Sequence, residues 1–320
     1  MGSIPTRSRH LPSPVEARLS TFVILNPAAG HGRSGRFREA VVRAAEAAWG
    51  EVELATTGAP GEAQALARGC VGRTERVIAV GGDGTVHEVA NGLLAGGATP
   101  PPLGVVPVGT GNDFAKLTGT AGLAPGRAIA ALASATTRRF DAGTAWGEHF
   151  INSLGIGLDA DVARRVNEYK HWPGALGYVV AALQALVHRR ALRLHVEVDG
   201  ERWSGPTTLF EVGIGHSTGG VFFLVPDAKP DDGLLDICAV GTVSLGFLLT
   251  RATRVLRGTH TTLSEVRMAR GTQVRITSDD GPLTAHLDGE LRAPGTNVLE
   301  IGVRPGALPV LVADARGRAA

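Results

Sequence analysis

The order of apolar and polar positions predicts an alternating α/β segment in the first 135 residues. Short apolar runs typical of buried strands occupy residues 21–26, 51–55, 76–80 and 103–107. Helical spacing separates them, at residues 37–49 and 61–70 and from Val86 to Leu93, where apolar side chains recur at i, i+3, i+4 and i+7. This alternation favours a parallel sheet with helices on both faces. Polar, glycine-rich turns follow three of the strands, at the sheet edge where such folds bind ligands.

The pattern changes near residue 140. Strands are expected at residues 140–144, 149–154, 192–198, 208–214, 234–240, 274–277, 283–287 and 298–303. Helices are expected only at 160–168, 176–189 and 245–257. The second part is therefore predicted to be a mainly antiparallel β-sandwich. The predicted division is a tail at 1–20, an α/β domain at 21–135, a sandwich at 136–295, a segment near 295–312 that packs back on the first domain, and a tail at 313–320.

Composition and charge narrow the class of protein. With 320 residues and 43% apolar residues the chain is long enough for two cores. Lys and Arg number 32 against 30 Asp and Glu, and the aromatic share is 5%, so we expect no nucleic-acid interface. Cys70 and Cys238 form neither a disulfide framework nor a zinc spacing, which favours a reducing cytoplasm. No run of eighteen apolar residues is present, so no membrane span is expected.

The first glycine-rich turn, residues 26–35, carries two partial motifs. Gly30, Gly32 and Gly35 spell G-x-G-x-x-G, but four residues separate them from the strand end, unlike a dinucleotide-binding turn. The same stretch lacks the Lys-Ser/Thr pair of a P-loop, because Arg36 and Phe37 stand there. Backbone N–H groups before a helix still attract phosphate. A purely structural turn is the alternative.

The second turn, Gly81-Gly82-Asp83-Gly84-Thr85, is more specific. Glycine permits positive φ and close approach of a bulky anion, and Asp83 offers a carboxylate that can hold a cation or accept a proton. Thr85 can cap the following helix or bind phosphate. His87, Glu88 and Asn91 lie off the apolar face of that helix and are expected to look toward the cleft. A plain helix cap by Asp83 is the alternative.

The third turn, residues 109–113, repeats this chemistry after the next strand. It contains two glycines and a threonine hydroxyl, and it places Asn112 and Asp113 at the start of a helix. Carboxylate oxygens are the ligands that Mg²⁺ prefers. Two acidic turns at neighbouring strand ends therefore predict a site for a magnesium nucleotide.

Taken together, the motifs resemble the diacylglycerol kinase catalytic-domain family, which includes sphingosine, ceramide and bacterial lipid kinases. The matching segments of the first part are Asn26-Pro27-x-x-Gly30, Thr57 with Gly61-Glu62-Ala63, Gly81 to Glu88 with Asn91-Gly92-Leu93, and Gly109 to Ala115. Those of the second part are Phe140 to Gly143, Asn152 to Asp159, Pro226-Asp227-Ala228, Asp232 to Asp236, and Asp288-Gly289-Glu290. The resemblance implies an NAD-kinase/phosphofructokinase-like α/β domain followed by a β-sandwich.

The resemblance also implies roles for individual residues. ATP is expected to contact Asn26, Pro27, Ala28, Ala29, Gly30, Thr57, Gly82, Asp83, Gly84, Thr85, Val86, His87, Glu88, Thr110 and Asn112. Catalytic Mg²⁺ is expected near Asp83, Asp113 and Asp141, and a second, structural Mg²⁺ near Lys229, Asp232 and Leu234. Asp288 and Glu290 are expected to supply the general base, with Asp83 as a rival.

The expected function is phosphorylation of a lipid that has a free hydroxyl, with diacylglycerol as the default and sphingoid or ceramide substrates open. The resemblance implies a homodimer and a cytoplasmic enzyme at the inner face of the membrane. The helix at 245–257 could make that contact, because Arg251, Arg254 and Arg257 oppose its apolar face, although a solvated surface explains the same pattern. The alternatives are NAD kinase, which shares the Gly81–Thr85 turn, a nicotinamide oxidoreductase and an inactive lipid-binding relative.

Overall fold

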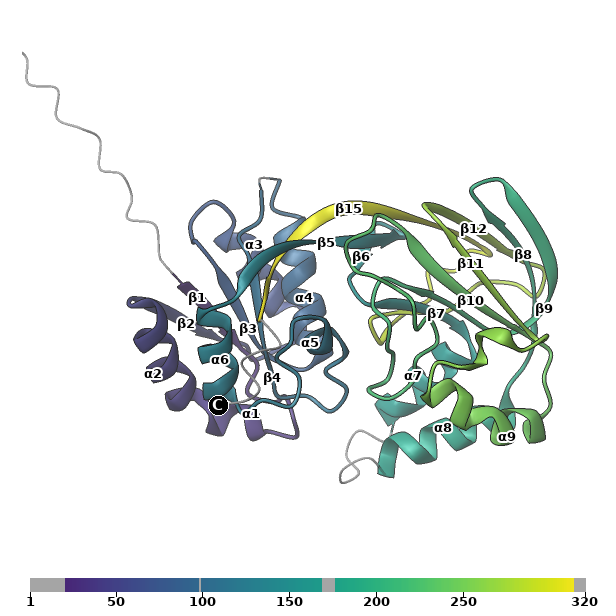
Figure 1. Ribbon diagram of the computed structural model, residues 1–320, viewed down its shortest axis with the longest axis horizontal. Helices are drawn as coiled ribbons and strands as arrows, with labels where there is room; N and C mark the ends of the chain where they lie inside the picture. Colours follow the sequence, from purple (N-terminus) through teal and green to yellow (C-terminus); the bar gives the residue numbers. More distant parts are fainter. Residues whose placement is uncertain (1–20, 98, 169–175, 314–320) are drawn as a thin grey trace, which may run out of the picture.

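The computed structural model describes residues 21–97, 99–168 and 176–313. One hydrogen-bonded sheet runs through the whole of this part in the order β14-β13-β7-β9-β8-β12-β15-β4-β3-β1-β2 (Figure 1). Its strands are β1 (Thr21–Leu25), β2 (Val52–Thr56), β3 (Val77–Gly81), β4 (Leu103–Pro107), β5 (Thr136–Ala145), β6 (Glu148–Phe150), β7 (Ser153–Gly157), β8 (Leu192–Val198), β9 (Glu201–Gly213), β10 (Leu235–Gly241), β11 (Val266–Gly271), β12 (Gln273–Ser278), β13 (Ala285–Leu287), β14 (Glu290–Arg292) and β15 (Val298–Val312).

The helices are unevenly distributed between the two parts (Figure 1). Those of the first part are α1 (Arg33–Arg36), α2 (Arg38–Trp49), α3 (Glu62–Cys70), α4 (Asp83–Leu94), α5 (Asp113–Leu117) and α6 (Pro125–Ala133). Those of the second part are α7 (Leu158–Glu168), α8 (Leu176–His188), α9 (Leu245–Leu256) and the 3-10 turn η1 (His260–Thr262). Among the described residues no helix has the length and apolarity that crossing a membrane requires.

Strands β2, β1, β3 and β4 are parallel, and their side chains alternate between two cores. Phe22 and Ile24 face α3 and α4, whereas Val23 and Leu25 face α2 and α6. Both faces are thus covered, which explains why these strands appear as continuous apolar runs rather than alternating ones. The carboxyl ends of β1, β3 and β4 lead directly into the three glycine-rich turns.

The second part is mainly antiparallel, and its two sheet layers enclose a core of their own. Phe150, Phe210 and Ile237 are among the buried residues of that core. Its outer surface is partly covered by α9, whose Phe247 and Leu248 pack near Cys238 and Val240. The predicted fold class is confirmed: a parallel α/β sheet is followed by an antiparallel β-sandwich.

Strand β15 is shared by both parts. It pairs antiparallel with β12 and β5, and then parallel with β4 through Val310 and Leu103. The register shifts between Arg304 and Leu308, and Gly306 there has a φ of 56°. The strand was expected to end at residue 303, and the observed β15 continues to Val312 past Pro305 and Pro309.

Further differences concern single elements. The strand expected at 149–154 is two strands, β6 and β7, separated by Ile151 and Asn152. Helix α6 and strands β11 and β14 were not predicted, and β9 begins earlier than expected. The predicted tail at 1–20 lies outside the described residues, as does the tail at 313–320 beyond Ala313.

Candidate active site

A cavity of about 640 Å³ lies where the turns after β3 and β4 face the second part. The first part contributes Asp83, Gly84 and the 110–114 segment, and the second part contributes residues 151–153, 218–221 and 286–290. The structure therefore brings Asp83, Asp113, Asp288 and Glu290 to one cavity, although up to about 200 residues separate them in the chain. Of the expected nucleotide contacts, Thr110, Gly84 and Val86 also line it.

The glycines of the three turns allow backbones to pack against each other. A Cβ on Gly30 would lie 2.2 Å from the carbonyl oxygen of Val108. A Cβ on Gly109 would lie 2.6 Å from the Cα of Gly82. Gly81, Gly82 and Gly84 do not take positive φ, so the left-handed backbone that glycine permits is not used there. Close packing between turns and side chains is the observed reason, since a Cβ on Gly81 would meet Thr85.

Asp83 holds the third turn in place. One carboxylate oxygen accepts a hydrogen bond from the Asn112 N–H at 2.7 Å and the other from the Asp113 N–H at 2.8 Å. Burial raises the pKa of Asp83 to about 6, with a further contribution from the negative charge of Asp113, despite these donors. A cation bound near Asp83 would favour the ionised form of its carboxyl group.

Asp113 is bonded to the loop on the other side of the cavity. Its carboxylate accepts hydrogen bonds from Lys116 Nζ at 2.7 Å, Ser217 Oγ at 2.9 Å and the Gly220 N–H at 2.9 Å. Lys116 also donates to the Gly220 carbonyl oxygen at 2.6 Å. Sequence analysis missed Lys116, although its position three residues after Asp113 on a helix is a recognised ion-pair spacing.

The space between Asp83 and Asp113 fits a cation. A Cβ on Gly111 would lie 2.8 Å from an oxygen of Asp83 and 3.4 Å from an oxygen of Asp113, so a side chain there would fill the space between the two carboxylates. Glycine leaves it open on the cavity side. Two carboxylates that repel each other beside an open space suit a divalent cation with oxygen ligands, as Mg²⁺ prefers.

Asp288 and Glu290 differ sharply in environment. Asp288 and Gly289, with φ of 51° and 91°, form the two-residue turn between β13 and β14, for which Asp-Gly is a preferred sequence. The Asp288 carboxylate accepts the N–H groups of residues 151–153 at 2.8–3.0 Å and contacts His87 Nδ1 at 2.8 Å. Within the described residues Glu290 is exposed and has no hydrogen-bond or ion-pair partner. Of the two, only Glu290 is free to accept a proton from a substrate.

The helix α4 residues expected to look into the cleft contact protein instead. His87 is 3% exposed and pairs with Asp288, and Asn91 bonds the backbone N–H and carbonyl of His149. Glu88 accepts the N–H groups of Gly61 and Ala63. His87, Glu88 and Asn91 are thus polar because they hold α4 against neighbouring segments, and none of the three lines the cavity.

The remaining turn residues also have protein partners. Asn26 donates from Nδ2 to Thr85 Oγ1 at 3.0 Å and accepts the Ala28 N–H at 3.0 Å. Thr57 is buried, and its N–H donates to the Leu25 carbonyl oxygen. Asn26 and Thr85 thus join the first turn to the second. Pro27, Ala29 and Gly30 lie in the same turn, beside the α1 N-terminus.

Asp141 does not join Asp83 and Asp113 at the cavity. Its buried carboxylate accepts the N–H groups of Gly233 and Gly306, both at 2.7 Å, while burial raises its pKa. It therefore lies with the 229–234 loop, where Asp232 accepts the Leu234 N–H and forms an ion pair with Arg270. Lys229 is exposed in that loop. The expected catalytic trio is thus split, because β5 carries Asp141 toward the bend in β15.

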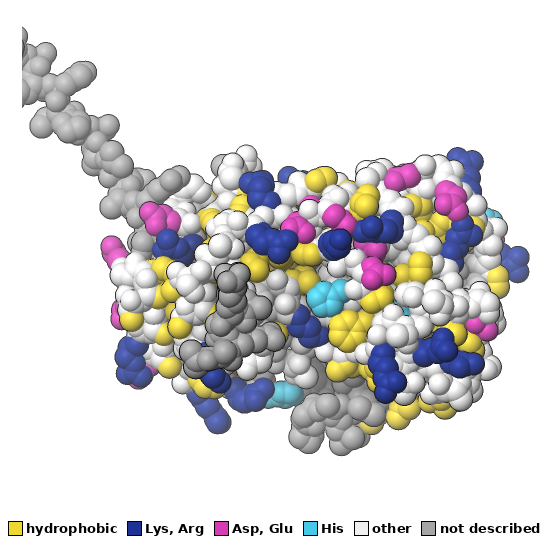
Figure 2. All heavy atoms as spheres, in the orientation of Figure 1, with side chains coloured by type: hydrophobic (Ala, Val, Ile, Leu, Met, Phe, Trp, Pro, Cys, Tyr) yellow, Lys and Arg dark blue, Asp and Glu magenta, His cyan; other side chains and the backbone are white. Residues whose placement is uncertain are grey.

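A second, apolar pocket of about 410 Å³ adjoins the cavity and shares Asp159, Val162 and Val221 with it. Its walls come from α7, α8, α9 and the sheet, with Leu209, Phe222 and Phe247 among them. Exposed hydrophobic side chains cluster around these helices, with Leu183 49% and Leu249 54% exposed. In Figure 2, hydrophobic and basic side chains lie side by side over this region at the lower right.

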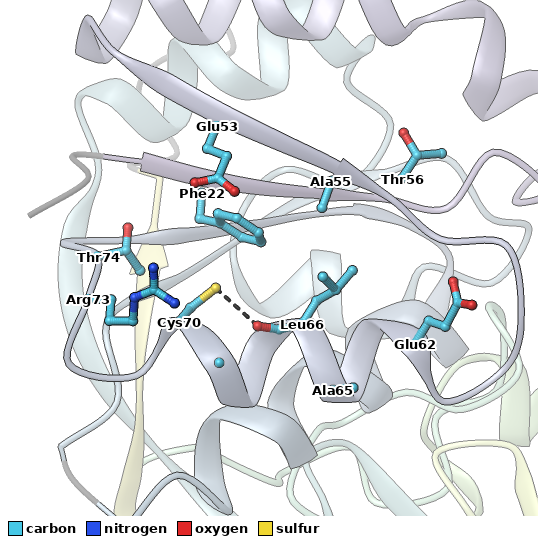
Figure 3. Close-up of a pocket in the computed structure, with 11 residues that line it drawn as sticks. Phe22, Glu53, Ala55, Thr56, Glu62, Ala65, Leu66, Cys70, Arg73 and Thr74 are labelled. Carbon is cyan, nitrogen blue, oxygen red and sulfur yellow. Dashed lines mark hydrogen bonds between the residues drawn. The ribbon is translucent and has the colours of Figure 1, made fainter.

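A separate hollow of about 510 Å³ lies between β2 and α3 (Figure 3). Cys70 lines it beside Phe22, with Glu53, Glu62 and Arg73 around the rim. The Cys70 thiol donates to the Leu66 carbonyl oxygen, and burial raises its pKa to about 12. A thiol that stays protonated is a poor nucleophile, so we assign no chemistry to this hollow.

Comparison with known proteins agrees with this architecture. Residues 20–145 match the diacylglycerol kinase catalytic domain, and residues 152–312 match the YegS C-terminal NAD kinase beta sandwich-like domain. A diacylglycerol kinase of Bacillus subtilis (strain 168) is 31% identical over 270 residues, which are 84% of this chain and 88% of that protein. One from Mycobacterium tuberculosis (strain H37Rv) is 31% identical over 296 residues, or 90% and 93% of the two chains.

Solved structures share the fold. A diacylglycerol kinase from Bacillus anthracis superposes with a TM-score of 0.72 at 21% identity, covering 93% of this chain and 98% of that one. Yeast NADH kinase complexed with NADH superposes with a TM-score of 0.50 at 10% identity, covering 94% and 85%. The two matched domains cover nearly all of the described residues, and relatives 31% identical match over most of both chains, so the chain belongs to the diacylglycerol kinase family of transferases.

Proposed function

We propose that this protein is an ATP-dependent lipid kinase that transfers the γ-phosphoryl group to the hydroxyl of diacylglycerol. The observation that carries the proposal is that a polar cavity and an apolar pocket adjoin each other. One is polar and contains Asp83, Asp113 and Glu290, and the other is lined with hydrocarbon. Asp159, Val162 and Val221 line both, so a molecule with acyl chains in the apolar pocket would place its polar end in the cavity.

We assign the nucleotide to the side of the cavity that the glycine-rich turns form. We infer that the phosphates lie over the α4 N-terminus and the 109–113 turn, where N–H groups and the helix dipole favour negative charge. Asp83 and Asp113 would hold Mg²⁺ in the space beside Gly111. When bound, the ion would neutralise charge on the phosphate oxygens. The contacts that order this turn, from Asp83 to Asn112 and Asp113, prepare the site before the nucleotide binds.

Glu290 is the proposed general base. Its carboxylate reaches over the start of α4, since one oxygen lies 2.9 Å from the position of a Cβ on Gly84. In the proposed step it accepts the proton of the substrate hydroxyl as that oxygen bonds to phosphorus and ADP leaves. A positioned base of this kind accelerates transfer by about 10²–10⁴-fold. Asp288 holds residues 151–153 and His87, and so positions the base rather than acting as one.

Access to the substrate is proposed to occur through α8 and α9. The exposed side chains of Leu183 and Leu249 line the apolar pocket together with Arg251 of α9. A basic and apolar surface of this kind binds anionic bilayers, at about 1 kcal/mol per Lys or Arg. Placement at the inner face of the membrane and a homodimer stay predictions.

The function is tested by transfer of label from γ-³²P-ATP in mixed micelles that contain diacylglycerol, with ceramide, sphingosine and NAD as rival acceptors. Label is expected in phosphatidic acid, and Asp83→Ala is expected to abolish it. The matched control is Asp161→Ala, which removes a surface carboxylate paired with Arg164. If the label appears in NADP or in a sphingoid product instead, the substrate is NAD or a sphingoid lipid and not diacylglycerol. Unchanged transfer by Asp83→Ala would refute the site.

A further inference from the structure

Three side chains that the proposed reaction does not use converge at the floor of the cavity. They are Asp159 at the start of α7, Glu211 on β9 and His286 on β13. One ligand atom from each lies within 4.8 Å of the other two. Glu211 and His286 are 0% and 2% exposed, and the Asp159 side chain is 13% exposed. Both Asp159 and His286 line the cavity, so the cluster is reached from there.

The hydrogen bonds of the cluster leave one oxygen without a donor. His286 Nε2 contacts an Asp159 oxygen at 2.5 Å, and Glu211 Oε1 accepts the Thr218 hydroxyl at 2.6 Å. Within the described residues the other Glu211 oxygen, Oε2, is buried without an N–H or O–H donor in hydrogen-bond geometry, and the Asp159 carboxylate is its acidic neighbour. A buried carboxylate oxygen in that position requires either a proton or a cation.

Gly155 gives the three side chains room to meet. A Cβ on Gly155 would lie 2.2 Å from Asp159 Oδ2, 2.5 Å from His286 Nε2 and 2.8 Å from Glu211 Oε2. The three atoms that point to this one position include the Glu211 oxygen without a donor. Any other residue at 155 would push them apart. Three donor atoms from three elements therefore share one small space on the cavity side of β7.

We propose that Asp159, Glu211 and His286 bind a divalent transition-metal cation of the zinc or manganese type. One imidazole nitrogen and two carboxylate oxygens form a mixed ligand set that these ions favour, whereas Mg²⁺ prefers oxygen ligands alone. Two carboxylates and a neutral imidazole balance the charge of the ion. Three protein ligands leave a further coordination position, which faces the cavity. The site is distinct from the Asp83–Asp113 space and does not depend on the proposed kinase reaction.

The ion would join three elements that wall the cavity. Helix α7, β9 and β13 contribute one ligand each, and β13 leads into the turn that carries Asp288. Binding is therefore expected to stabilise the second part of the protein. A ligand that binds only the folded state raises its stability by an amount that grows with the ligand concentration.

The test is metal binding by the full chain without ATP or lipid. Protein dialysed against a chelator is titrated calorimetrically with Zn²⁺ and with Mn²⁺ in a large excess of Mg²⁺, and retained metal is measured after gel filtration. One equivalent of Zn²⁺ is expected, with a higher thermal midpoint. Glu211→Gln, which keeps an acceptor for Thr218, is expected to weaken Zn²⁺ binding at least tenfold. His195→Gln is the matched control, because it removes an imidazole that pairs with Asp279 on the surface.

Two outcomes would overturn the proposal: no stoichiometric Zn²⁺ or Mn²⁺ binding by the unmodified protein, or equal affinity in Glu211→Gln. Should Glu211→Gln fail to fold, Co²⁺ bound to the unmodified protein gives a visible spectrum that reports its ligands. Bands of a site with nitrogen and oxygen ligands are expected, and the spectrum of hexaaqua Co²⁺ would contradict the site. Asp83→Ala is expected to retain Zn²⁺ binding while losing lipid phosphorylation, which separates this site from the proposed function.

Discussion

Replacing Asp288 should damage folding more than chemistry, and replacing Glu290 should do the reverse. The Asp288 side chain is 4% exposed and accepts hydrogen bonds from three backbone N–H groups and from His87. Each buried donor left without an acceptor costs about 1–3 kcal/mol. The neighbouring cavity can admit water, so the lower value applies to each. With the loss of the His87 contact, we expect Asp288→Ala to lower the free energy of unfolding by about 4 kcal/mol.

The pH dependence of this loss has a defined sign. Burial lowers the pKa of His87, but the hydrogen bond and charge of Asp288 outweigh it, so that the pKa stands above its ordinary 6.5. The raised pKa means that the folded state holds the proton more tightly than the unfolded state. The contribution of the pair is therefore complete below pH 6.5 and is lost as the pH rises through the folded pKa. The effect of Asp288→Ala should be larger at pH 6 than at pH 9.

Urea unfolding followed by tryptophan fluorescence measures the stability, and phosphoryl transfer is measured on the same preparations. Glu290→Gln should change the free energy of unfolding by less than about 0.5 kcal/mol, as is usual at exposed positions, while turnover falls by about 10²–10⁴-fold. Asp288→Asn keeps one acceptor oxygen and should fall between the wild type and Asp288→Ala in stability. The reasoning is refuted if Asp288→Asn unfolds like the wild type and yet has no activity, or if Glu290→Gln keeps full turnover.

Three further predictions concern the cavity and the exposed face of helix α9. Gly111→Ala should displace the Asp83 carboxylate, because its Cβ would lie 2.8 Å away, and should reduce turnover at least ~10-fold in steady-state assays at varied Mg²⁺; an unchanged Mg²⁺ dependence would count against a cation there. Lys116→Met should remove the charged hydrogen bonds from Lys116 to Asp113 and to the Gly220 carbonyl oxygen, each worth about 1.5–3 kcal/mol, and should raise KM by loosening the 217–220 loop, which keeps its direct bonds to Asp113. Unchanged kinetics would show that the Lys116 contacts are dispensable. Leu249→Ser combined with Arg251→Glu should weaken the binding free energy to anionic vesicles, measured by co-sedimentation, by more than about 1 kcal/mol, and added salt should also weaken binding of the wild type. Equal sedimentation of the variant and the wild type would exclude this face of α9 as the membrane contact.

The order of strands, helices and turns in the first part was predicted well, because it follows from local sequence patterns. Apolar strands buried on both faces, each followed by a glycine-rich turn, place those turns at one sheet edge whatever the packing details. The motifs likewise identified Asp83, Asp113 and Glu290, which the structure does bring to one cavity. The Asp288-Gly289 dipeptide also carried a hairpin signal that sequence analysis did not use.

Long-range partners could not be derived in this way. The polarity of His87 is compatible with a cleft or with a buried pair, and only the position of Asp288, 201 residues later, decides between them. Asp141 offers the same carboxylate as Asp113, yet its strand carries it to Gly233 and Gly306. Glu211 and His286 lie in strand segments whose neighbouring residues are also buried, so no local spacing marks them as neighbours of Asp159.

Strand β15 has a consequence for how the chain is made. The edge of β4 is covered by residues near Val310, and Leu308 and Val310 are fully buried in the core of the first part. During synthesis the first 135 residues leave the ribosome long before β15 is made. Until then their sheet has one unpaired edge, at β4, and one incomplete core. Its final stability is therefore set at the end of translation, and a nascent chain stalled before residue 298 exposes a strand edge of the kind that chaperones protect from aggregation.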